Sequence, residues 1–263
     1  MTVRHVVVES DRWRGPPLRI GLISDTHVTS PHVDARRVRR VVEQMNAERP
    51  DVVVLLGDYV GGHLPSHVRS AAERDQILAG LTAFGQLSAR YGVFGVQGNH
   101  DSWFDELSTA DALERANVVV LENRATVIER ADGSFWIAGL ADLYSRRHTA
   151  SVDAALADVP QDAPALLLTH WPDPFDEVPS RVALTLAGHT HCGQVNLPVL
   201  GRLIHASAGS ARWQCGLYQE GGRQIFVTGG VGVSILPVRF RAPPEIVILT
   251  LRSPTLASGV APH

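Results

Sequence analysis

Five short stretches of the sequence combine carboxylate, imidazole and amide side chains. Taken singly, each has an ordinary structural explanation, because a Gly-Asp pair is usually a turn and a Gly-Asn-His-Asp stretch could cap the following helix. Taken together, oxygen and nitrogen ligands in this number indicate a metal site for manganese, iron or zinc. The stretches supply Asp25 and His27, then Asp58, then Asn99, His100 and Asp101, then His170, and last His189 and His191.

The number of these side chains predicts two metal ions rather than one. A structural zinc site needs about four ligands, and the sequence provides more candidate ligands than that. A bridging carboxylate could hold two divalent ions about 3.5–4 Å apart, the separation that two-metal hydrolases use. The predicted ligands are Asp25, His27, Asp58, Asn99, His170, His189 and His191.

Each stretch follows a short apolar run that predicts a β-strand. The runs occupy residues 18–23, 52–56, 93–96, 165–168 and 184–186. In open α/β sheets, ligands bind at the edge formed by the carboxyl ends of the strands. We therefore expect the five polar stretches to form one site at one sheet edge.

The remaining pattern predicts two packed sheets with helices outside, in the α/β class. Helices are expected at residues 34–48, 68–90 and 108–115, with Ser108 and Asp111 as the capping pair of the third. Hairpins are expected at residues 125–138 and 216–228, and a final strand at residues 245–251. We expect a single domain over residues 1–252 and a disordered tail over residues 253–263.

The composition is ordinary for a soluble globular protein. The chain has 263 residues, 44% of them hydrophobic, and a net charge of −3. This charge gives no electrostatic footprint for nucleic acid. The first residues form no signal peptide, and no uncharged apolar run is long enough to span a bilayer. We expect a cytoplasmic protein with no membrane anchor and no specific nucleic-acid partner; the oligomeric state is left open.

The order and spacing of the five motifs resemble the calcineurin-like metallophosphoesterase family over residues 18–251. The resemblance implies a four-layer αββα sandwich of two mixed β-sheets. It also implies that Asp25, His27 and His191 hold the first ion, that Asn99, His170 and His189 hold the second, and that Asp58 bridges them. His100 and Asp101 are the implied catalytic residues, with His100 facing the substrate as general acid and Asp101 orienting its ring.

Two further segments resemble the bacterial branch of the family often called YkuE- or YaeI-like. They are the Gly-His-Thr-His-x-Gly-Gln segment and the ending of residues 236–245. This branch usually has glycine at the position of Cys192, so we expect Cys192 to be a thiol beside the site and not a ligand. A disulfide between Cys192 and Cys215 is also open, although a cytosolic thiol pair fits the sequence equally well. We expect His189 and His191 on extended backbone, with Thr190 pointing the other way.

The implied activity is hydrolysis of phosphodiester bonds by a metal-bridging hydroxide, with monoesters left open. The substrate is expected to be a small phosphoester, contacted by Asn99 and by His63. One alternative is a pyrophosphatase acting on nucleotide-linked lipids such as UDP-diacylglucosamine, although no apolar lid is evident. An alternative of another class is a non-catalytic binding scaffold on the same fold, which would not need the full ligand set and His100.

Overall fold

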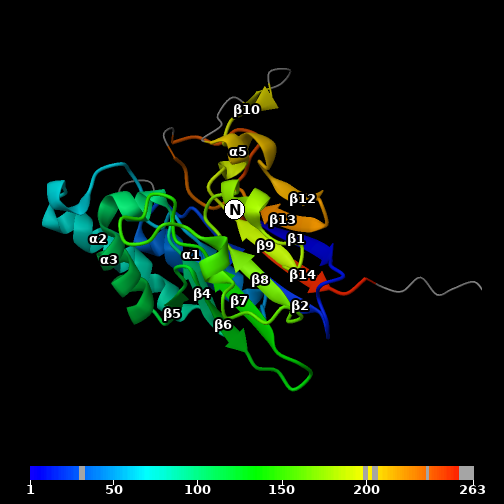
Figure 1. Cartoon of the computed structure of the whole chain (residues 1–263). Helices are drawn as coiled ribbons and strands as arrows, with labels where there is room; N and C mark the ends of the chain where they lie inside the picture. Colours follow the sequence, from blue (N-terminus) through cyan, green and yellow to red (C-terminus); the bar gives the residue numbers. More distant parts are fainter. Residues whose placement is uncertain (30–32, 198–200, 203–206, 235–236, 255–263) are drawn as a thin grey trace, which may run out of the picture.

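The computed structural model describes residues 1–29, 33–197, 201–202, 207–234 and 237–254. Two six-stranded sheets form the centre of the molecule, and helices α1 to α3 gather on one side of them (Figure 1). The first sheet has the order β1-β14-β2-β3-β4-β5 and the second β12-β13-β9-β8-β7-β6. Each sheet contains both parallel and antiparallel pairs. The predicted two-sheet α/β architecture is therefore confirmed.

The strands of the first sheet are β1 (Thr2–Glu9), β2 (Leu18–Ile23), β3 (Val52–Leu56), β4 (Val93–Val96), β5 (Val118–Val120) and β14 (Glu245–Arg252). Those of the second are β6 (Arg124–Ile128), β7 (Phe135–Gly139), β8 (Ala165–Leu168), β9 (Leu184–Ala187), β12 (Gly216–Glu220) and β13 (Arg223–Val227). A short pair, β10 (Asn196–Leu197) and β11 (Gly201–Arg202), lies apart from both sheets. Both predicted hairpins form, as β6–β7 and β12–β13.

Three apolar clusters separate the four layers. Between the sheets, fully buried strand residues pack face to face, such as Leu22 and Val54 of the first sheet and Leu168 and Leu186 of the second. The outer face of the first sheet packs on α1 (Ala35–Ala47), α2 (Ala71–Thr82) and α3 (Asn99–Arg115). The outer face of the second packs on α4 (Val152–Ala155) and the segments that carry Phe175 and Trp213, next to α5 (Ala208–Arg212).

Two helices differ from their predicted bounds. The helix expected at residues 68–90 is α2, which begins after Ser70, where Ser70 and Glu73 form a capping box, and gives way to a 3-10 turn at Ala83–Gln86. The helix expected at residues 108–115 begins earlier, at Asn99, and is kinked at Asp105. The Asp105 carboxylate caps the second part by accepting from the Ser108 N–H, so the predicted Ser108–Asp111 capping pair is wrong.

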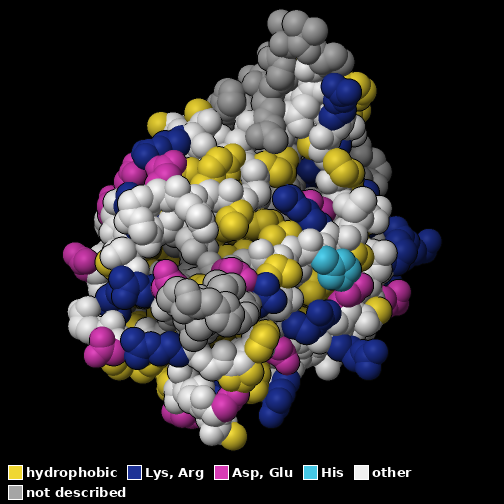
Figure 2. Space-filling view, turned by 90° about the vertical axis from the view of Figure 1, so that its right-hand side faces the viewer, with side chains coloured by type: hydrophobic (Ala, Val, Ile, Leu, Met, Phe, Trp, Pro, Cys, Tyr) yellow, Lys and Arg dark blue, Asp and Glu magenta, His cyan; other side chains and the backbone are white. Residues whose placement is uncertain are grey.

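Helix α1 confirms the first predicted helix and buries Val38, Val41, Val42 and Met45. Strand β14 ends at Arg252, one residue before the predicted tail, most of which lies outside the described residues. No helix in the described part of the chain is long and apolar enough to cross a bilayer. On the face where β12, β13 and β14 lie, arginine and acidic side chains are interspersed with apolar ones (Figure 2).

Candidate metal centre

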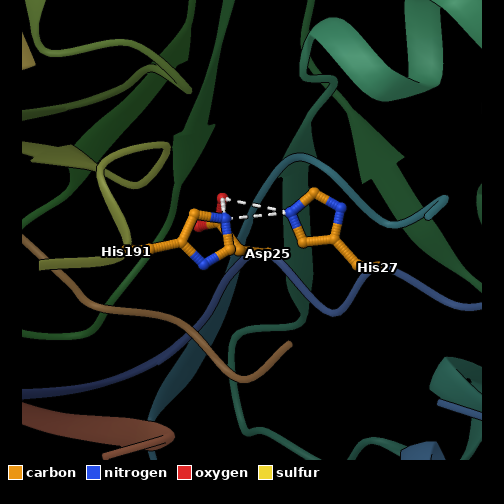
Figure 3. A group of neighbouring side chains, drawn as sticks. All are labelled: Asp25, His27 and His191. Atoms are coloured by element: carbon orange, nitrogen blue, oxygen red, sulfur yellow. Dashed lines mark hydrogen bonds and ion pairs between the residues drawn. The ribbon is translucent and has the colours of Figure 1, made fainter. Parts of the chain in front are cut away.

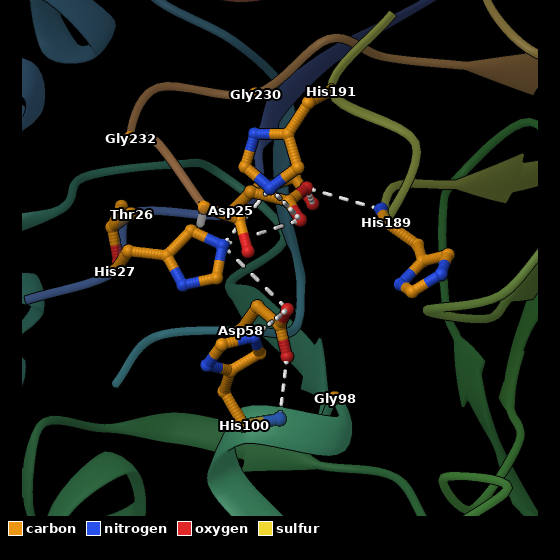
Figure 4. Close-up of polar contacts among 12 residues, drawn as sticks. Asp25, Thr26, His27, Asp58, Gly98, His100, His189, His191, Gly230 and Gly232 are labelled. Atoms are coloured by element: carbon orange, nitrogen blue, oxygen red, sulfur yellow. Dashed lines mark hydrogen bonds and ion pairs between the residues drawn. The ribbon is translucent and has the colours of Figure 1, made fainter. Parts of the chain in front are cut away.

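The loops that follow β2, β3, β8 and β9, together with the start of α3 after β4, meet at one edge of the two sheets. Figure 4 shows side chains from the loops after β2, β3 and β9 and from the start of α3 lying close together, with Asp25, His27, Asp58 and His191 at the centre. All of the predicted ligands are buried, with at most 8% of any of them exposed. The structure thus brings the five sequence motifs into one site, as their position at strand ends predicts.

The first group of candidate ligands consists of Asp25, His27 and His191 (Figure 3). The Nε2 atoms of the two histidines lie 3.0 Å apart. The Oδ1 atom of Asp25 lies 3.4 Å from His191 Nε2 and 3.9 Å from His27 Nε2. Three buried ligand atoms at these separations could hold one ion between them.

The second group consists of Asp58, His170 and His189. His170 Nε2 lies 3.3 Å from Asp58 Oδ2 and 3.2 Å from His189 Nδ1. Asn99, the first residue of α3, has its amide oxygen buried near the start of the helix. This group therefore offers two imidazoles and a carboxylate to a second ion.

Asp58 links the two groups. Its Oδ2 atom lies 3.6 Å from His27 Nε2 of the first group and 3.3 Å from His170 Nε2 of the second. The same oxygen lies 3.9 Å from His100 Nε2. A single carboxylate in contact with both groups has the placement that a bridging ligand requires.

Buried polar atoms without partners support a metal at this place. Two oxygens of the candidate ligands, Asp25 Oδ1 and Asn99 Oδ1, are among the buried atoms of the described residues that make no hydrogen bond. Such atoms are rare in native proteins, and an ion is one of the few explanations. The donor set of carboxylate, imidazole and amide also matches manganese, iron or zinc. The residues present therefore fit divalent ions.

Burial keeps three of the four candidate histidine ligands neutral. It lowers the pKa of His27 to about 3, and it lowers the pKa of His189 and of His191 well below the usual value. A neutral imidazole is the form that binds a metal. These three rings are ready to bind an ion at neutral pH.

His170 and Asp58 instead form a charged pair in the absence of metal. Burial opposes a charge on His170, but the neighbouring Asp58 carboxylate raises the pKa of His170 to about 10. Burial would likewise raise the pKa of Asp58, but His170 and His100 hold it well below the usual value. Burial also raises the pKa of Asp25 to about 7. Without a metal ion, His170 and, in part, Asp25 therefore carry protons that a bound ion would replace.

Five of the candidate ligands have backbone in the left-handed region. They are Asp25, His27, Asp58, His189 and His191, with φ between 46° and 67°. Non-glycine residues rarely adopt this conformation, and it persists where the surrounding structure imposes it, typically at functional sites. The prediction that His189 and His191 lie on extended backbone is therefore wrong. Thr190 between them is near-helical, and its hydroxyl donates to the Gln214 carbonyl.

Two glycines allow the loops to approach this closely. A Cβ atom at Gly98 would overlap Asp58, and one at Gly188 would overlap Ser24 and Asp25. Gly188 N–H donates to the His170 carbonyl, and the His189 N–H donates to Asp25 Oδ2 at 3.2 Å. Any side chain at these glycines would push the candidate ligands apart.

Arg239 contacts the candidate site, and the sequence reasoning gave it no role there. Its guanidinium donates to His191 Nδ1 at 2.9 Å and to the carbonyls of Gly229 and Gly232 at 2.7 Å each. The segment 229–232 packs directly on the Asp25 loop, with Gly232 N–H donating to the Asp25 carbonyl. The available signal was the ending of residues 236–245, which had only indicated a branch of the family.

His100 lies in the site, but its ring is oriented differently from the prediction. Its Nδ1 contacts the Gly62 carbonyl at 2.8 Å, which leaves Nε2 facing Asp58. The Asp101 carboxylate accepts instead from the N–H groups of Tyr59, Val60 and Gly98. Asp101 thus holds the loop that carries Asp58, and the predicted ring-orienting contact is made by Gly62.

His63 and Cys192 were also singled out by sequence. The His63 ring is exposed and lies 4.8 Å from the His100 ring, at the surface of the site. Cys192 forms a disulfide with Cys215, so the expected free thiol is not observed. Cys192 has a φ of 52°, a conformation that favours glycine.

Comparison with known proteins agrees with this geometry. A family model for calcineurin-like phosphoesterases matches residues 18–193. The chain therefore belongs to the calcineurin-like phosphoesterase family, a class of metal-dependent phosphoric ester hydrolases. The resemblance inferred from the five motifs is confirmed.

Individual relatives are similar over most of the chain. It is 31% identical over 238 residues to the uncharacterized metallophosphoesterase YkuE of Bacillus subtilis, covering 89% of this chain and 79% of YkuE. It is 28% identical over 239 residues to the phosphodiesterase YaeI of Escherichia coli, covering 89% and 82%. It is 31% identical to a transmembrane protein with metallophosphoesterase domain of Danio rerio, covering 89% of this chain but 53% of that protein. The chain thus spans about half the length of the last relative.

Solved structures support the fold alone. The 5′-nucleotidase precursor of Thermus thermophilus superposes with a TM-score of 0.50 at 15% sequence identity. The match covers 89% of this chain and 55% of the nucleotidase.

Proposed function

We propose that this protein is a dinuclear metal-dependent phosphodiesterase. The observation that carries the proposal is Asp58, whose Oδ2 lies within 3.6 Å of ligand nitrogens from both groups, His27 and His170. A site for one ion would not need a carboxylate shared between two sets of buried ligands. The printed name of the Escherichia coli relative, a phosphodiesterase, supports diesters as the substrate class.

In this proposal, each ion has its own ligands and shares Asp58. Asp25, His27 and His191 would hold the first ion, and Asn99, His170 and His189 the second. Manganese, iron and zinc all suit this mixture of nitrogen and oxygen ligands. When bound, two such ions supply a nucleophile from water at neutral pH and neutralise charge on the phosphoryl group.

His100 would act as the general acid. Its Nδ1 donates to the Gly62 carbonyl, so a second proton on the protonated ring is carried by Nε2, on the side of Asp58. In hydrolysis, a water oxygen bonds to phosphorus and the bond from phosphorus to the leaving oxygen breaks. The leaving oxygen then takes the Nε2 proton. Asp101 contributes indirectly, because it binds the backbone next to Asp58.

The substrate is proposed to be a small phosphodiester, with His63 and Asn99 as candidate contacts. His63 supports this role by its position beside His100 at the surface. We also propose that residues 1–252 act as one domain, because β14 lies between β1 and β2 in the first sheet and ends at Arg252. The predicted cytoplasmic location stays a prediction. The Cys192–Cys215 disulfide argues against it, because cytosolic reductants keep thiols reduced.

Metal analysis combined with an ester screen tests the proposal. We expect two equivalents of Mn²⁺ per chain at saturation and hydrolysis of bis-p-nitrophenyl phosphate. A p-nitrophenyl monoester in the same screen measures the preference between diesters and monoesters. Two bound ions without turnover of any ester would favour the non-catalytic scaffold. Turnover confined to a nucleotide-linked lipid would favour the pyrophosphatase.

A further inference from the structure

A continuous row of aromatic rings lies beside the metal centre. It runs from His100 to Trp103, Tyr144, Trp171 and His189, with successive ring centroids 4.9, 5.6, 5.6 and 3.6 Å apart. His63 joins it at the His100 end. Both ends of the row are residues of the candidate metal centre.

The middle of the row lies outside the three apolar clusters that join the layers. Trp103, Tyr144 and Trp171 belong to none of the three apolar clusters found among the described residues. Tyr144 is 54% exposed, and Trp103 is half-buried. Large rings usually gain stability by leaving water. Trp171 is buried at 6% exposed and forms the inner part of the row, whereas the Trp103 and Tyr144 rings lie partly at the surface next to a reaction centre and are available to a ligand.

A buried carboxylate holds the row in place. Asp142 is 3% exposed, and its Oδ1 accepts from Trp171 Nε1 at 2.7 Å. Its Oδ2 accepts from the Ser102 hydroxyl at 2.7 Å and from the Tyr144 N–H at 3.0 Å. Ser102 lies next to Trp103 in α3. One side chain thus fixes the segments that carry all three large rings, so a ligand would find them already ordered.

We propose that this row binds a planar ring carried by the leaving group of the substrate, the class that includes nucleosides and aryl alcohols. The proposal rests on the proposed function, because His100 would protonate the leaving oxygen and Trp103 lies next to His100. Groups attached to that oxygen would therefore meet the aromatic row. Ring faces favour stacking with another planar ring and are tolerant of its identity.

A pair of matched inhibitors tests the proposal without turnover. Monomethyl phenylphosphonate and monomethyl cyclohexylphosphonate share charge and size, and only the first is planar. Calorimetry on the Mn²⁺-loaded protein should show tighter binding of the phenyl compound by roughly two- to tenfold. Equal affinities would overturn the proposal.

Variants of the row should change this ratio and not merely the affinity. Trp103→Leu and Tyr144→Leu should bring the phenyl-to-cyclohexyl ratio close to one. Tyr144→Phe keeps the ring and should keep the ratio. Leu107→Ala, a change at a residue of α3 that is 57% exposed, is the control for surface substitution. A ratio that is unchanged in both leucine variants would also overturn the proposal.

Two further ligands identify the source of the ring. Tighter binding of a thymidine 5′-methylphosphonate than of the phenyl compound supports a nucleoside, and the reverse supports a simple aryl group. Monomethyl octylphosphonate tests an acyl chain, for which Leu64 and Leu143, 59% and 45% exposed, lie adjacent in sequence to His63 and Tyr144. Tightest binding of the octyl compound would overturn the planar-ring proposal.

The binding experiments test the aromatic row, and the ester screen tests the proposed phosphodiesterase activity, so one can fail without the other. Planar discrimination without hydrolysis of any ester would reject the phosphodiesterase and retain the ring-binding row. Hydrolysis without discrimination would do the reverse.

Discussion

The Arg239 guanidinium donates to His191 Nδ1 at 2.9 Å. Arginine has only donors, so Nδ1 is the accepting nitrogen of this ring. In the neutral ring Nε2 then carries the proton and faces Asp25 Oδ1, 3.4 Å away, so that proton must move before Nε2 can bind an ion. A residue close to the C-terminal strand therefore fixes the ring orientation of a candidate ligand in the turn after β9.

Replacing Arg239 should change the affinity for one ion and spare the other. The Arg239 contact holds the proton of His191 on Nε2, the nitrogen that faces the site, and it places a positive charge beside the first group of candidate ligands. We expect Arg239→Met to raise the affinity for one of two Mn²⁺ equivalents by roughly tenfold, and Arg239→Lys to change it less. Calorimetric titration of the metal-free protein gives both affinities. Arg223→Met is the control, because Arg223 donates to carbonyls of Phe175 and Asp176 in another layer. Equal changes at both ions, no change, or a loss would contradict the assigned role.

Replacing Asp58 should disrupt both ions. Its Oδ2 contacts ligands of both groups, so Asp58→Ala removes a shared ligand. We expect bound Mn²⁺ to fall well below one equivalent after dialysis, as measured by elemental analysis. Retention of one full equivalent would show that one site is complete without Asp58.

Metal binding should release protons in a pH-dependent way. The pKa of His170 is about 10 and that of Asp25 about 7, so His170 is protonated at pH 8 and Asp25 is partly protonated at pH 7. Both must lose their protons to bind an ion, whereas His27, with a pKa of about 3, is already neutral. Mn²⁺ affinity should therefore rise steeply up to pH 7 and by about tenfold per pH unit from there toward pH 10.

Calorimetry in two buffers with different ionisation enthalpies measures this release. At pH 8 we expect about one proton per chain on saturation with metal, and more at pH 7. A binding enthalpy that does not depend on the buffer would mean that His170 is neutral before the metal arrives.

Replacing His100 should matter most for poor leaving groups. General acid catalysis contributes typically about 10²- to 10⁴-fold, and p-nitrophenolate leaves without needing a proton. We expect His100→Asn to keep both metals and lose on the order of a hundredfold or more in kcat/KM on an alkyl diester. The loss on a p-nitrophenyl ester should be clearly smaller. Similar losses on both substrates would make His100 a phosphate-binding residue.

Removing the disulfide should affect stability more than metal content. The bond joins residues 23 apart in sequence, and closing a loop of that length contributes roughly 3 kcal/mol. We expect the Cys192→Gly, Cys215→Ser double variant to melt several degrees lower by calorimetry and to bind both ions. Glycine suits the φ of 52° at position 192. A missing metal equivalent in this variant would make a cysteine sulfur a ligand.

The parts of the site that follow from local pattern could be predicted. Asp25, Asp58 and His170 each come directly or nearly directly after a buried apolar strand, and carboxyl ends of parallel strands meet at one edge. The pairing of β2, β3 and β4 in parallel then brings the motifs together. Recognising the strands and knowing that ligands bind at the carboxyl ends of parallel strands is enough to predict that these residues meet.

The contacts that tune the site depend on residues far apart in sequence. Arg239 lies 48 residues from His191, and Asp101 lies 42 residues from its partner Tyr59. Sequence periodicity does not indicate partners this far apart. Asp101 was therefore predicted to orient the His100 ring, whereas the Gly62 carbonyl makes that contact in the structure. The left-handed backbone at Asp25 and Asp58 is likewise imposed by packing around the loops. Asp adopts this conformation more readily than most residues, but most Asp residues do not, so the sequence did not indicate it at these two positions.

The position of β14 between β1 and β2 sets an order for assembly during synthesis. The first sheet cannot close until Glu245–Arg252 has left the ribosome, and Arg239 emerges only shortly before it. Asp58, His170 and His189 are by then already translated, and at about 5–20 residues per second they precede Arg239 by a few seconds to a few tens of seconds. The ligands of the second ion are thus all present in the nascent chain while the ring of His191 still lacks the guanidinium that orients it. All seven candidate ligands leave the ribosome before Arg239, so the contact to the His191 ring is the last part of the centre that synthesis supplies.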